Sequence, residues 1–377
     1  MAPWHFVSPE SPPRVGGVAD FTRVMATALA ATGRQVHVWS PAPADAMAGV
    51  SVHPLEGGYA ARHLGAIGRA LDTCEAPRRL FVQWVPHGFG YKSLNIPFCL
   101  WVWRRARAGD SLHVMVHEPY LPFDSRRLRQ NVGAVAHRLM LMVLLRAADR
   151  VWVSTPSFVP MVRRFGPRRP LQYSWLPVPS PIARHGLPAE VQARRRALAA
   201  TSPVIGYFGT ASLLVADVLG KVIAGIARRR PDVKFVLLGR GSDTLADALE
   251  ACDPLLGQAI VARGERSAQE ISTLIQCCDV FVQPYPDGVS ARRTTLMALL
   301  EHGSTVVASS GVRTEESWNQ ALRLTPDGDA GAMIDAAVQL LDQPEDRARL
   351  SGAAMHTYLE RFHVERAVAT LVGGAGE

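Results

Sequence analysis

The sequence has very little lysine: only three of its 41 basic residues are lysine, and the others are arginine. It also has no long apolar run, because the longest, 139–145, is far shorter than the roughly 20 residues that a membrane-spanning helix needs. The first residues contain no apolar segment of the kind found in secretory signals. The five cysteines show no metal-ligand spacing. These absences argue against a transmembrane or disulfide-stapled secreted protein and predict a cytoplasmic one.

Acidic residues are scarce in the first half of the chain. Residues 1–180 contain 21 basic and 10 acidic side chains, a net charge of +11, whereas residues 181–377 carry −3. Such an asymmetry favours an anionic partner for the first half, such as a membrane surface or an acidic acceptor. No nucleic-acid recognition module is visible, so we do not expect nucleic acid to be that partner.

Short apolar runs alternate with amphipathic helical patterns along both halves, as expected for parallel βαβ units. The strands predicted from this pattern are 4–7, 35–39, 80–84, 113–117, 151–154, 204–208, 234–238, 280–283 and 305–308. The sequence therefore predicts an α/β protein with two Rossmann-like, doubly wound domains. Such sheets bind ligands at the C-terminal ends of their strands, so we expect a cleft there.

A proline-rich segment separates the two halves. Residues 176–188 contain four prolines and one glycine, a composition that excludes a regular element. We therefore place one domain at 1–175, a linker at 176–188, a second domain at 189–360 and a C-terminal tail at 361–377.

The segment PYPDGVSARRTTLMALLEHG, residues 284–303, has an unusual distribution of charge. It predicts a turn followed by a helix over 290–302, with Ser290 as the N-cap. Arg292 and Arg293 would then lie in the first helical turn, where the helix dipole disfavours cations. A phosphate or diphosphate between the helix end and the guanidinium groups would resolve this conflict. The alternative is that both arginines extend into solvent.

Glycine-rich turns follow several predicted strands. Gly16 and Gly17 precede the first helix, where glycine lets a ligand approach the free N–H groups of the helix end. This turn lacks the spacing of a dinucleotide-binding motif or a P-loop. Asp20, in the first turn of that helix, is a candidate base or a simple capping group. Further candidate ligand contacts follow two strands of the second half: Thr210, Ser212 and Arg240.

Polar residues after two other strands of the first half are candidate sugar contacts. His117 and Glu118 lie at the end of the predicted strand 113–117. Histidine can donate to a sugar hydroxyl or act as a base near neutral pH, although a structural histidine gives the same pattern. His87 and Tyr91 belong to a glycine-rich aromatic loop, which would line an acceptor pocket or serve packing alone.

These features resemble those of a GT-B fold glycosyltransferase of the family 4 type. The resemblance covers nearly the whole chain and rests on the Gly16-Gly17 turn, His117, the linker and residues 278–309. It implies a retaining hexosyltransferase-like enzyme of bacterial glycan biosynthesis that uses a nucleotide-diphosphate sugar. It also implies an acceptor-binding first domain, a donor-binding second domain, no cofactor and no metal.

The chain departs from the family pattern where charge is expected. The family's two glutamates should fall at Ser290 and Ala298, and its arginine and lysine near Thr210 and Val215, but none of these residues is charged. The resemblance therefore implies a divergent branch in which the paired arginines neutralise the diphosphate. The catalytic candidates are His117, Arg292, Arg293 and Asp20. The donor-binding candidates are Gly16, Gly17, Thr210, Ser212, Arg240, Ser290, Thr294 and Thr295. The acceptor-binding candidates are His87, Tyr91 and Glu118.

Three functions fit these observations. The first is sugar transfer to the hydroxyl of a carbohydrate, lipid-linked or small-molecule acceptor. Retention lets the diphosphate take the acceptor proton, whereas inversion needs a base, for which Asp20 or His117 is the candidate. The second is a degenerate nucleotide-sugar-binding partner protein, which the missing glutamates would explain. The third is a GT-B-like nucleotide-sugar epimerase, which would need carboxylates in the cleft.

Two basic amphipathic segments suggest contact with a membrane. Residues 94–107 combine apolar and aromatic side chains with an arginine cluster, and Arg126, Arg127 and Arg129 precede an apolar helix. Segments of this kind bind anionic bilayers unless their apolar faces belong to the core. Peripheral membrane contact is therefore one expectation, and burial of these faces is the other.

Overall fold

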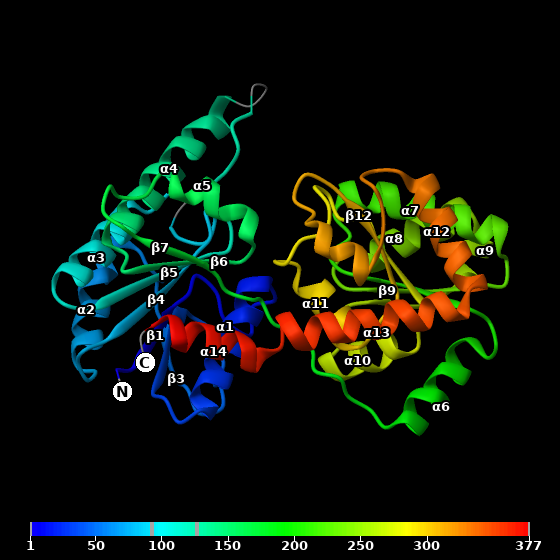
Figure 1. Cartoon of the computed structure of the whole chain (residues 1–377), viewed down its shortest axis with the longest axis horizontal. Helices are drawn as coiled ribbons and strands as arrows, with labels where there is room; N and C mark the ends of the chain where they lie inside the picture. Colours follow the sequence, from blue (N-terminus) through cyan, green and yellow to red (C-terminus); the bar gives the residue numbers. More distant parts are fainter. Residues whose placement is uncertain (1, 91–93, 125–127, 376–377) are drawn as a thin grey trace. The chain divides into compact units, whose positions relative to one another are not determined.

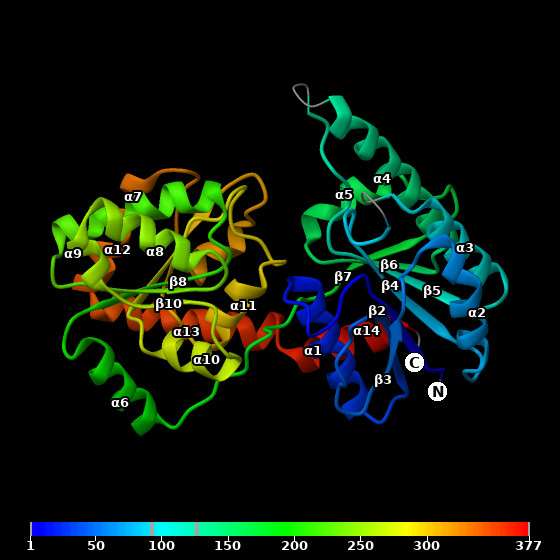
Figure 2. The same cartoon turned by 180° about the vertical axis from the view of Figure 1, so that it is seen from behind.

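The computed structural model describes residues 2–90, 94–124 and 128–375. The chain divides into two compact units, one formed by Met1–Pro179 with Val364–Glu377 and the other by Ser180–His363. Each unit is built on a parallel sheet with helices on both faces (Figures 1 and 2). This is the pair of doubly wound α/β domains that the sequence predicts.

The sheet of unit 1 has seven strands in the order β3-β2-β1-β4-β5-β6-β7. They are β1 (Trp4–Val7), β2 (Val36–Pro41), β3 (Ser51–Leu55), β4 (Arg79–Trp84), β5 (Ser111–Val116), β6 (Arg150–Val153) and β7 (Gln172–Trp175). The central strands are nearly continuous apolar runs because helices cover both of their faces. Strand order reverses between β1 and β4, which places the expected ligand crevice at their C-terminal ends.

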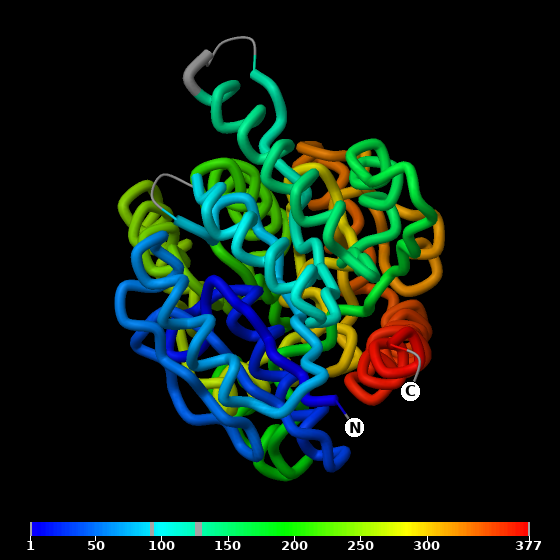
Figure 3. The backbone as a smooth tube through the Cα atoms, turned by 90° about the vertical axis from the view of Figure 1, so that its left-hand side faces the viewer, coloured from blue at the N-terminus to red at the C-terminus, as the bar shows by residue number. Residues whose placement is uncertain are grey.

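Two helical layers enclose this sheet. One face is covered by α2 (Leu64–Asp72), α3 (Ile96–Arg107) and α4 (Leu128–Ala147). The other face is covered by α1 (Gly17–Ala31) and α14 (Val364–Gly374). The unit also contains η1 (Ala61–His63), η2 (Pro156–Phe158) and α5 (Val159–Arg163). The N-terminal half of α4 projects beyond the other helices of the unit (Figures 1 and 3).

The segment expected to be a C-terminal tail is a helix instead. In α14 the side chains of Ala367, Val368 and Leu371 are buried at helical spacing. They pack against the apolar face of α1, which carries Phe21 and Met25. The prediction of a tail is wrong because residues 364–374 carry an apolar face that is buried against α1, which a solvated tail would lack.

The sheet of unit 2 has six strands in the order β10-β9-β8-β11-β12-β13. They are β8 (Val204–Phe208), β9 (Lys234–Leu238), β10 (Ile260–Gly264), β11 (Val280–Gln283), β12 (Val306–Ser310) and β13 (Arg323–Pro326). One face is covered by α7 (Leu213–Arg229), α8 (Ser242–Cys252), α9 (Pro254–Ala259) and α12 (Ala330–Asp342). Further helices are α6 (Pro188–Ala199), α10 (Ala268–Gln276), η3 (Glu316–Gln320), α11 (Thr294–Glu301) and α13 (Pro344–Arg361). Strand order reverses between β8 and β11.

The hydrophobic pattern of the sequence does not predict four of the strands, and all four lie at sheet edges: β3, β7, β10 and β13. It also does not predict the polar helix α6 or the short helix α9. None of the helices in the described part of the chain combines the length and hydropathy that crossing a membrane requires.

Candidate functional site

A buried amide joins β8 and β11 where the strand order of unit 2 reverses. Gln283, the last residue of β11, is fully buried, and its Nε2 donates to the carbonyl of Phe208 at the end of β8 (3.1 Å). Its buried Oε1 has no hydrogen-bond partner among the described residues. Sequence analysis missed Gln283, although a polar residue that ends an apolar strand is a signal for it.

The turns that follow β8 and β9 lie in close contact. The backbone N–H of Gly209 donates to Leu238 (3.0 Å), and that of Ala211 donates to Arg240 (2.8 Å). Gly239 has φ of 102°, and a Cβ there would overlap the Gly209 carbonyl. Only glycine permits this approach. The candidate residues Thr210, Ser212 and Arg240 are exposed on these turns.

The helix expected over 290–302 begins later, so one sequence prediction is wrong. The first helical residue of α11 is Thr294, and Arg293 is its N-cap. Residues 289–291 are buried, and the N–H of Val289 donates to Ser309 (2.9 Å). This contact with the end of β12 holds the chain out of helical geometry. Arg292 therefore lies in the turn before the helix rather than in its first turn.

Arg293 is held in a defined place beside the end of β11. Its Nη2 donates to the carbonyl of Pro286 (2.9 Å), and its guanidinium lies 4.9 Å from the ring centre of Tyr285. The hydroxyls of Tyr285 and Thr295 are 3.3 Å apart. Burial raises the pKa of Tyr285 to about 12, so its phenol stays neutral at physiological pH. The site thus presents oriented positive charge with neutral hydroxyl groups beside it.

The other candidates of this segment differ in accessibility. Ser290 is almost completely buried, whereas Arg292, Thr294 and Thr295 are half-buried. Asp287 has φ of 64° and precedes Gly288 with φ of 85° in a tight turn. A Cβ at Gly288 would overlap the backbone of Gly311, which follows β12. The turn therefore brings the ends of β11 and β12 together at the same edge of the sheet.

In unit 1 a carboxylate lies at the start of α1. Glu10 Oε1 accepts from the backbone N–H of Ala19 (3.3 Å), and a Cβ on Gly16 would lie 2.7 Å from the same oxygen. Glycine at position 16 therefore makes room for the Glu10 side chain. Asp20 lies next along the helix, and burial raises the pKa of its carboxyl against the opposing effect of Arg23.

His117 belongs to a buried hydrogen-bond chain. Its Nε2 lies 3.1 Å from Gln83 Oε1, and Gln83 Nε2 donates to Thr22 Oγ1 (2.7 Å). Thr22 Oγ1 in turn donates to the Val18 carbonyl (2.7 Å) and lies 3.0 Å from Ser8 Oγ. Because an amide oxygen can only accept, Nε2 of His117 carries the proton. Burial lowers the pKa of His117 to about 3, so the ring is neutral and is a weak base.

The acceptor candidates lie at the C-terminal ends of β4 and β5. His87 is exposed and its ring meets that of His137 edge to face at 5.5 Å. Glu118 is half-buried directly after His117. Tyr91 lies outside the described residues. A cavity of about 430 Å³ opens nearby, lined by residues after β2, β3 and β4, including Gly58, Tyr59, Gly88, Gly90 and Asn95.

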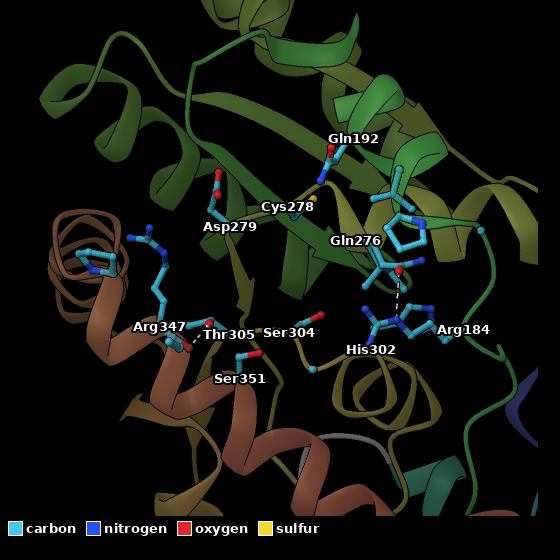
Figure 4. A pocket seen from close by; sticks show the side chains of 17 residues that line it. Arg184, Gln192, Gln276, Cys278, Asp279, His302, Ser304, Thr305, Arg347 and Ser351 are labelled. Atoms are coloured by element: carbon cyan, nitrogen blue, oxygen red, sulfur yellow. Dashed lines mark hydrogen bonds between the residues drawn. The ribbon is translucent and has the colours of Figure 1, made fainter. Parts of the chain in front are cut away.

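A cavity of about 710 Å³ in unit 2 lies at the opposite edge of its sheet, where the strands begin (Figure 4). It is lined by Asp279 and Thr305, which precede β11 and β12, and by Arg347 of α13. Asp279 Oδ2 accepts from the Val204 backbone and pairs with Arg195 (3.1 Å). The polar groups that line this cavity therefore connect structural elements. The cavity is also remote from the C-terminal strand ends, where α/β sheets bind ligands.

Among the described residues of these loops, metal-ligating side chains do not converge. Among the residues that the structure describes, the one group with suitable spacing is His5, His37 and Cys74. It lies on the face of β1 and β2 that α2 covers. The expectation that donor binding needs no metal stays a prediction.

The chain is similar to known proteins in sequence over part of unit 2 and in fold over its length. Residues 202–343 match the family described as glycosyl transferases group 1. No curated protein matches the chain. Sucrose-phosphate synthase from Thermosynechococcus elongatus has a similar structure, with a TM-score of 0.75 and 16% identity over 100% of this chain and 98% of that chain.

Two further solved structures span both units. HepE from Anabaena, in complex with UDP and glucose, has a TM-score of 0.71 and 15% identity, and each chain is covered completely. WaaG, a glycosyltransferase involved in lipopolysaccharide biosynthesis, has a TM-score of 0.68 and 14% identity over 98% of this chain and 100% of that chain. The fold is therefore that of the GT-B glycosyltransferases. Within this fold, the match to glycosyl transferases group 1 lies in unit 2.

Proposed function

We propose that the protein transfers a sugar from a nucleotide-diphosphate donor to an acceptor hydroxyl, with retention and without a metal. The observation that carries this proposal is the arginine pair 292–293, directly before α11 and next to the strand-order reversal of unit 2. HepE has been solved in complex with UDP and with UDP-glucose, which makes a uridine nucleotide the first donor to test.

The arginines would stabilise the departing diphosphate. Negative charge grows on this group as its bond to the sugar breaks, so oriented cations lower the barrier. Arg293 is already held by Pro286 and Tyr285, which reduces the reorganisation needed during reaction. Thr210 and Ser212 on the neighbouring turn would donate to phosphate oxygens, and the Gly16-Gly17 turn is a separate candidate phosphate contact in unit 1. The guanidinium groups supply the charge that a metal would otherwise provide.

Retention is favoured by the lack of a strong base in the buried network. The bond between the anomeric carbon and the diphosphate breaks, and the acceptor oxygen bonds to that carbon on the same face. The acceptor proton passes to the departing diphosphate oxygen. A pKa of about 3 makes His117 unsuitable as a base, so we assign it contact with the donor sugar. Asp20 is the base in the inverting alternative.

The acceptor would bind in unit 1. The cavity beside Tyr59 and Gly88 is large enough for a monosaccharide unit, and His87 and Glu118 lie at the same strand ends. A hydroxyl of a carbohydrate, a lipid-linked glycan or a small molecule fits this chemistry. WaaG acts in lipopolysaccharide biosynthesis, which supports a bacterial glycan as the first acceptor class to test.

The test combines binding and turnover. Thermal unfolding is measured with UDP, GDP, ADP, dTDP and their common sugars, and hydrolysis or transfer is followed for any nucleotide sugar that binds. A ligand at a hundred times its Kd adds roughly 2.7 kcal/mol to stability. The shift should disappear in Arg292→Ala/Arg293→Ala. It should persist in Arg228→Ala/Arg229→Ala, which changes an exposed arginine pair at the C-terminal end of α7. Binding without any turnover would instead support a nucleotide-sugar-binding partner protein.

We also propose that unit 1 contacts anionic membranes through the projecting half of α4. In α3 the side chains of Phe98, Cys99 and Val102 are buried, as the core alternative predicts, while Ile96 and Leu100 are 45% and 39% exposed. In α4, Val132 is 68% exposed, and Val135 and Leu139 are 47% and 46% exposed. Their spacing of three and four residues aligns them on one face. Arg126 and Arg127 lie outside the described residues.

Flotation with vesicles tests this contact. Vesicles that contain phosphatidylglycerol should carry the protein upward, and those of phosphatidylcholine alone should not. Val132→Ser/Val135→Ser should weaken flotation, whereas Leu255→Ser, at a 70% exposed leucine of unit 2, should leave it unchanged. Equal flotation of both variants would contradict a role for α4.

A further inference from the structure

We infer that unit 1 contains a zinc site formed by His5, His37 and Cys74. A ring nitrogen of each histidine and the sulfur of Cys74 all lie within 4.8 Å of one another. The site is separate from the strand-end loops proposed to bind donor and acceptor.

The parallel sheet places the two histidines side by side. His5 in β1 and His37 in β2 are register partners, so their side chains leave the same face of adjacent strands. Their ring centres are 4.6 Å apart and their planes differ by 12°. Cys74 follows α2, which packs over this face. The three residues lie far apart in the sequence, which explains why their spacing gave no metal signal.

An unsatisfied nitrogen points independently to a ligand. The side chain of His5 is fully buried, and its Nε2 has no hydrogen-bond partner among the described residues. A buried polar atom without a partner is unfavourable, and zinc that replaces the proton on Nε2 would give this nitrogen a partner. Its Nδ1 accepts from Trp39 Nε1 at 3.2 Å. Coordination through Nε2 moves the ring proton to Nδ1, so this long hydrogen bond with Trp39 is lost.

A third histidine orients the second ligand. His37 Nδ1 lies 3.0 Å from His53 Nε2, and His53 stacks on Trp39 with ring centres 3.9 Å apart. When His37 donates its Nδ1 proton to His53, its Nε2 keeps the lone pair that binds metal. A hydrogen bond of this kind, from a ligating histidine to a fixed acceptor, is a common feature of zinc sites.

The donor set and its surroundings select the metal. Two imidazoles and one thiolate suit zinc, whereas calcium and magnesium require oxygen ligands. Two arginines near His5 are compensated by two carboxylates: Arg78 pairs with Asp110 at 2.8 Å and Arg105 with Asp72 at 2.7 Å. With three protein ligands, the fourth position would be taken by water. Bound zinc would join β1, β2 and the segment after α2.

The full chain, made without a histidine tag, provides the test. After removal of metal with a chelator, zinc titration should give one bound ion per chain and a higher Tm. Cobalt substitution should give the near-ultraviolet band of a thiolate bound to cobalt. Cys74→Ser should lose this band and bind zinc at least tenfold more weakly. Cys252→Ser, at an exposed cysteine of unit 2, should behave like the unchanged protein.

His37→Asn tests whether zinc binds to the three-residue site or to the Cys74 thiol alone. If all three residues are ligands, this variant should also lose stoichiometric zinc. Circular dichroism of each metal-free variant establishes that it is folded. Substoichiometric zinc in the unchanged protein, or full zinc binding by Cys74→Ser, would overturn the inference. None of these readouts depends on transferase activity, so failure here would leave the proposed function standing.

Discussion

Glu10 Oε1 lies 3.3 Å from the backbone nitrogen of Ala19, so a side-chain carboxylate already occupies the N-terminal end of α1. The sequence predicts that the Gly16-Gly17 turn offers this helix end to a diphosphate. In the structure the partial positive charge of the helix is balanced by Glu10 instead. A diphosphate bound there would have to displace the carboxylate or tolerate its repulsion.

Glu10→Gln should therefore strengthen nucleotide-diphosphate binding. The amide keeps the shape of the side chain but removes a negative charge beside the ligand. We expect Kd for the nucleotide that binds to fall about three- to tenfold, and the free protein to lose about 0.3–1 kcal/mol because the helix dipole loses its anion. Calorimetric titration measures the first effect, and thermal unfolding measures the second.

Glu56→Gln removes the same charge from an exposed position of unit 1 and serves as the control. Weaker binding by Glu10→Gln would show that the carboxylate contacts the ligand directly, for example through a ribose or sugar hydroxyl. That result would remove the Gly16-Gly17 turn from the diphosphate site.

Arg293 should be irreplaceable by lysine. Its planar guanidinium contacts both the Pro286 carbonyl and the Tyr285 ring, and an ammonium group cannot reproduce this pair of contacts. Removing one oriented donor from a developing anion typically costs about 10²–10³-fold in kcat. We expect Arg293→Ala to lie in this range and Arg293→Lys to recover less than about a tenth of the lost rate.

Steady-state kinetics with the nucleotide sugar identified by thermal unfolding measures this effect. A loss mainly in kcat indicates stabilisation of the departing diphosphate, whereas a loss confined to KM indicates uniform binding. Arg228→Ala should retain full activity. Normal kinetics in Arg293→Ala would exclude this residue from the reaction.

The interior of each sheet could be predicted from the sequence, but its edges could not. Interior strands such as β1 and β8 are buried over their full length, so each appears as an apolar run. The edge strand β3 reads SVHPL, with an internal proline and only one buried side chain. The edge strand β7 reads QYSW and has no fully buried residue. The hydrophobic pattern of a sequence indicates which residues are buried, not which are hydrogen-bonded in a sheet. Edge strands are hydrogen-bonded to a neighbouring strand although few of their side chains are buried, so the pattern does not reveal them.

The candidate site shows a similar division. Glycine turns after the strands could be predicted because their composition is local. The start of α11 could not, because burial of Val289 and its bond to Ser309 in β12 move the N-cap three residues along the chain, from Ser290 to Arg293. The roles of Gln83 and Gln283 also depend on neighbouring strands. Sequence pattern identifies which residues reach the strand ends, whereas tertiary contacts decide which of them are held there.

Unit 2 should lose stability as the pH falls below about 6.5. Burial, the largest cause, lowers the pKa of His302 to about 4, while its ordinary value is 6.5. At neutral pH the ring is uncharged in both the folded and unfolded states and has no effect. Between pH 6.5 and 4 the unfolded chain takes up a proton that the folded one does not, so unfolding becomes more favourable. His302 should contribute about 2 kcal/mol of this loss at pH 5.

The measurement is the change in Tm between pH 7 and pH 5. His302→Gln removes this titration and should make the pH dependence shallower, whatever its stability at pH 7. His356→Gln, at an exposed histidine of α13, is the matched control and should keep the original slope. An unchanged slope in His302→Gln would contradict a buried neutral ring bonded to Ser272 and Ala298.

Gly239→Ala and Gly352→Ala should change stability in opposite directions. Gly239 has a positive φ, and a methyl group there would overlap the carbonyl of Gly209 on the neighbouring turn. We expect a loss of about 2 kcal/mol or more, because the turn must shift to relieve both conflicts. Gly352 lies within α13 with no atom within 4 Å of the added methyl, so alanine should stabilise the helix by up to about 1 kcal/mol.

Thermal unfolding of both variants, with and without the nucleotide that binds, tests this pair. The turn at Gly239 positions Thr210 and Ser212, so Gly239→Ala should also weaken nucleotide binding more than its loss of stability alone would explain. Gly352→Ala should bind as the unchanged protein does. If Gly239→Ala destabilised the fold but bound nucleotide normally, the β8 and β9 turns would be structural, and the donor contacts would have to come from the arginine pair before α11.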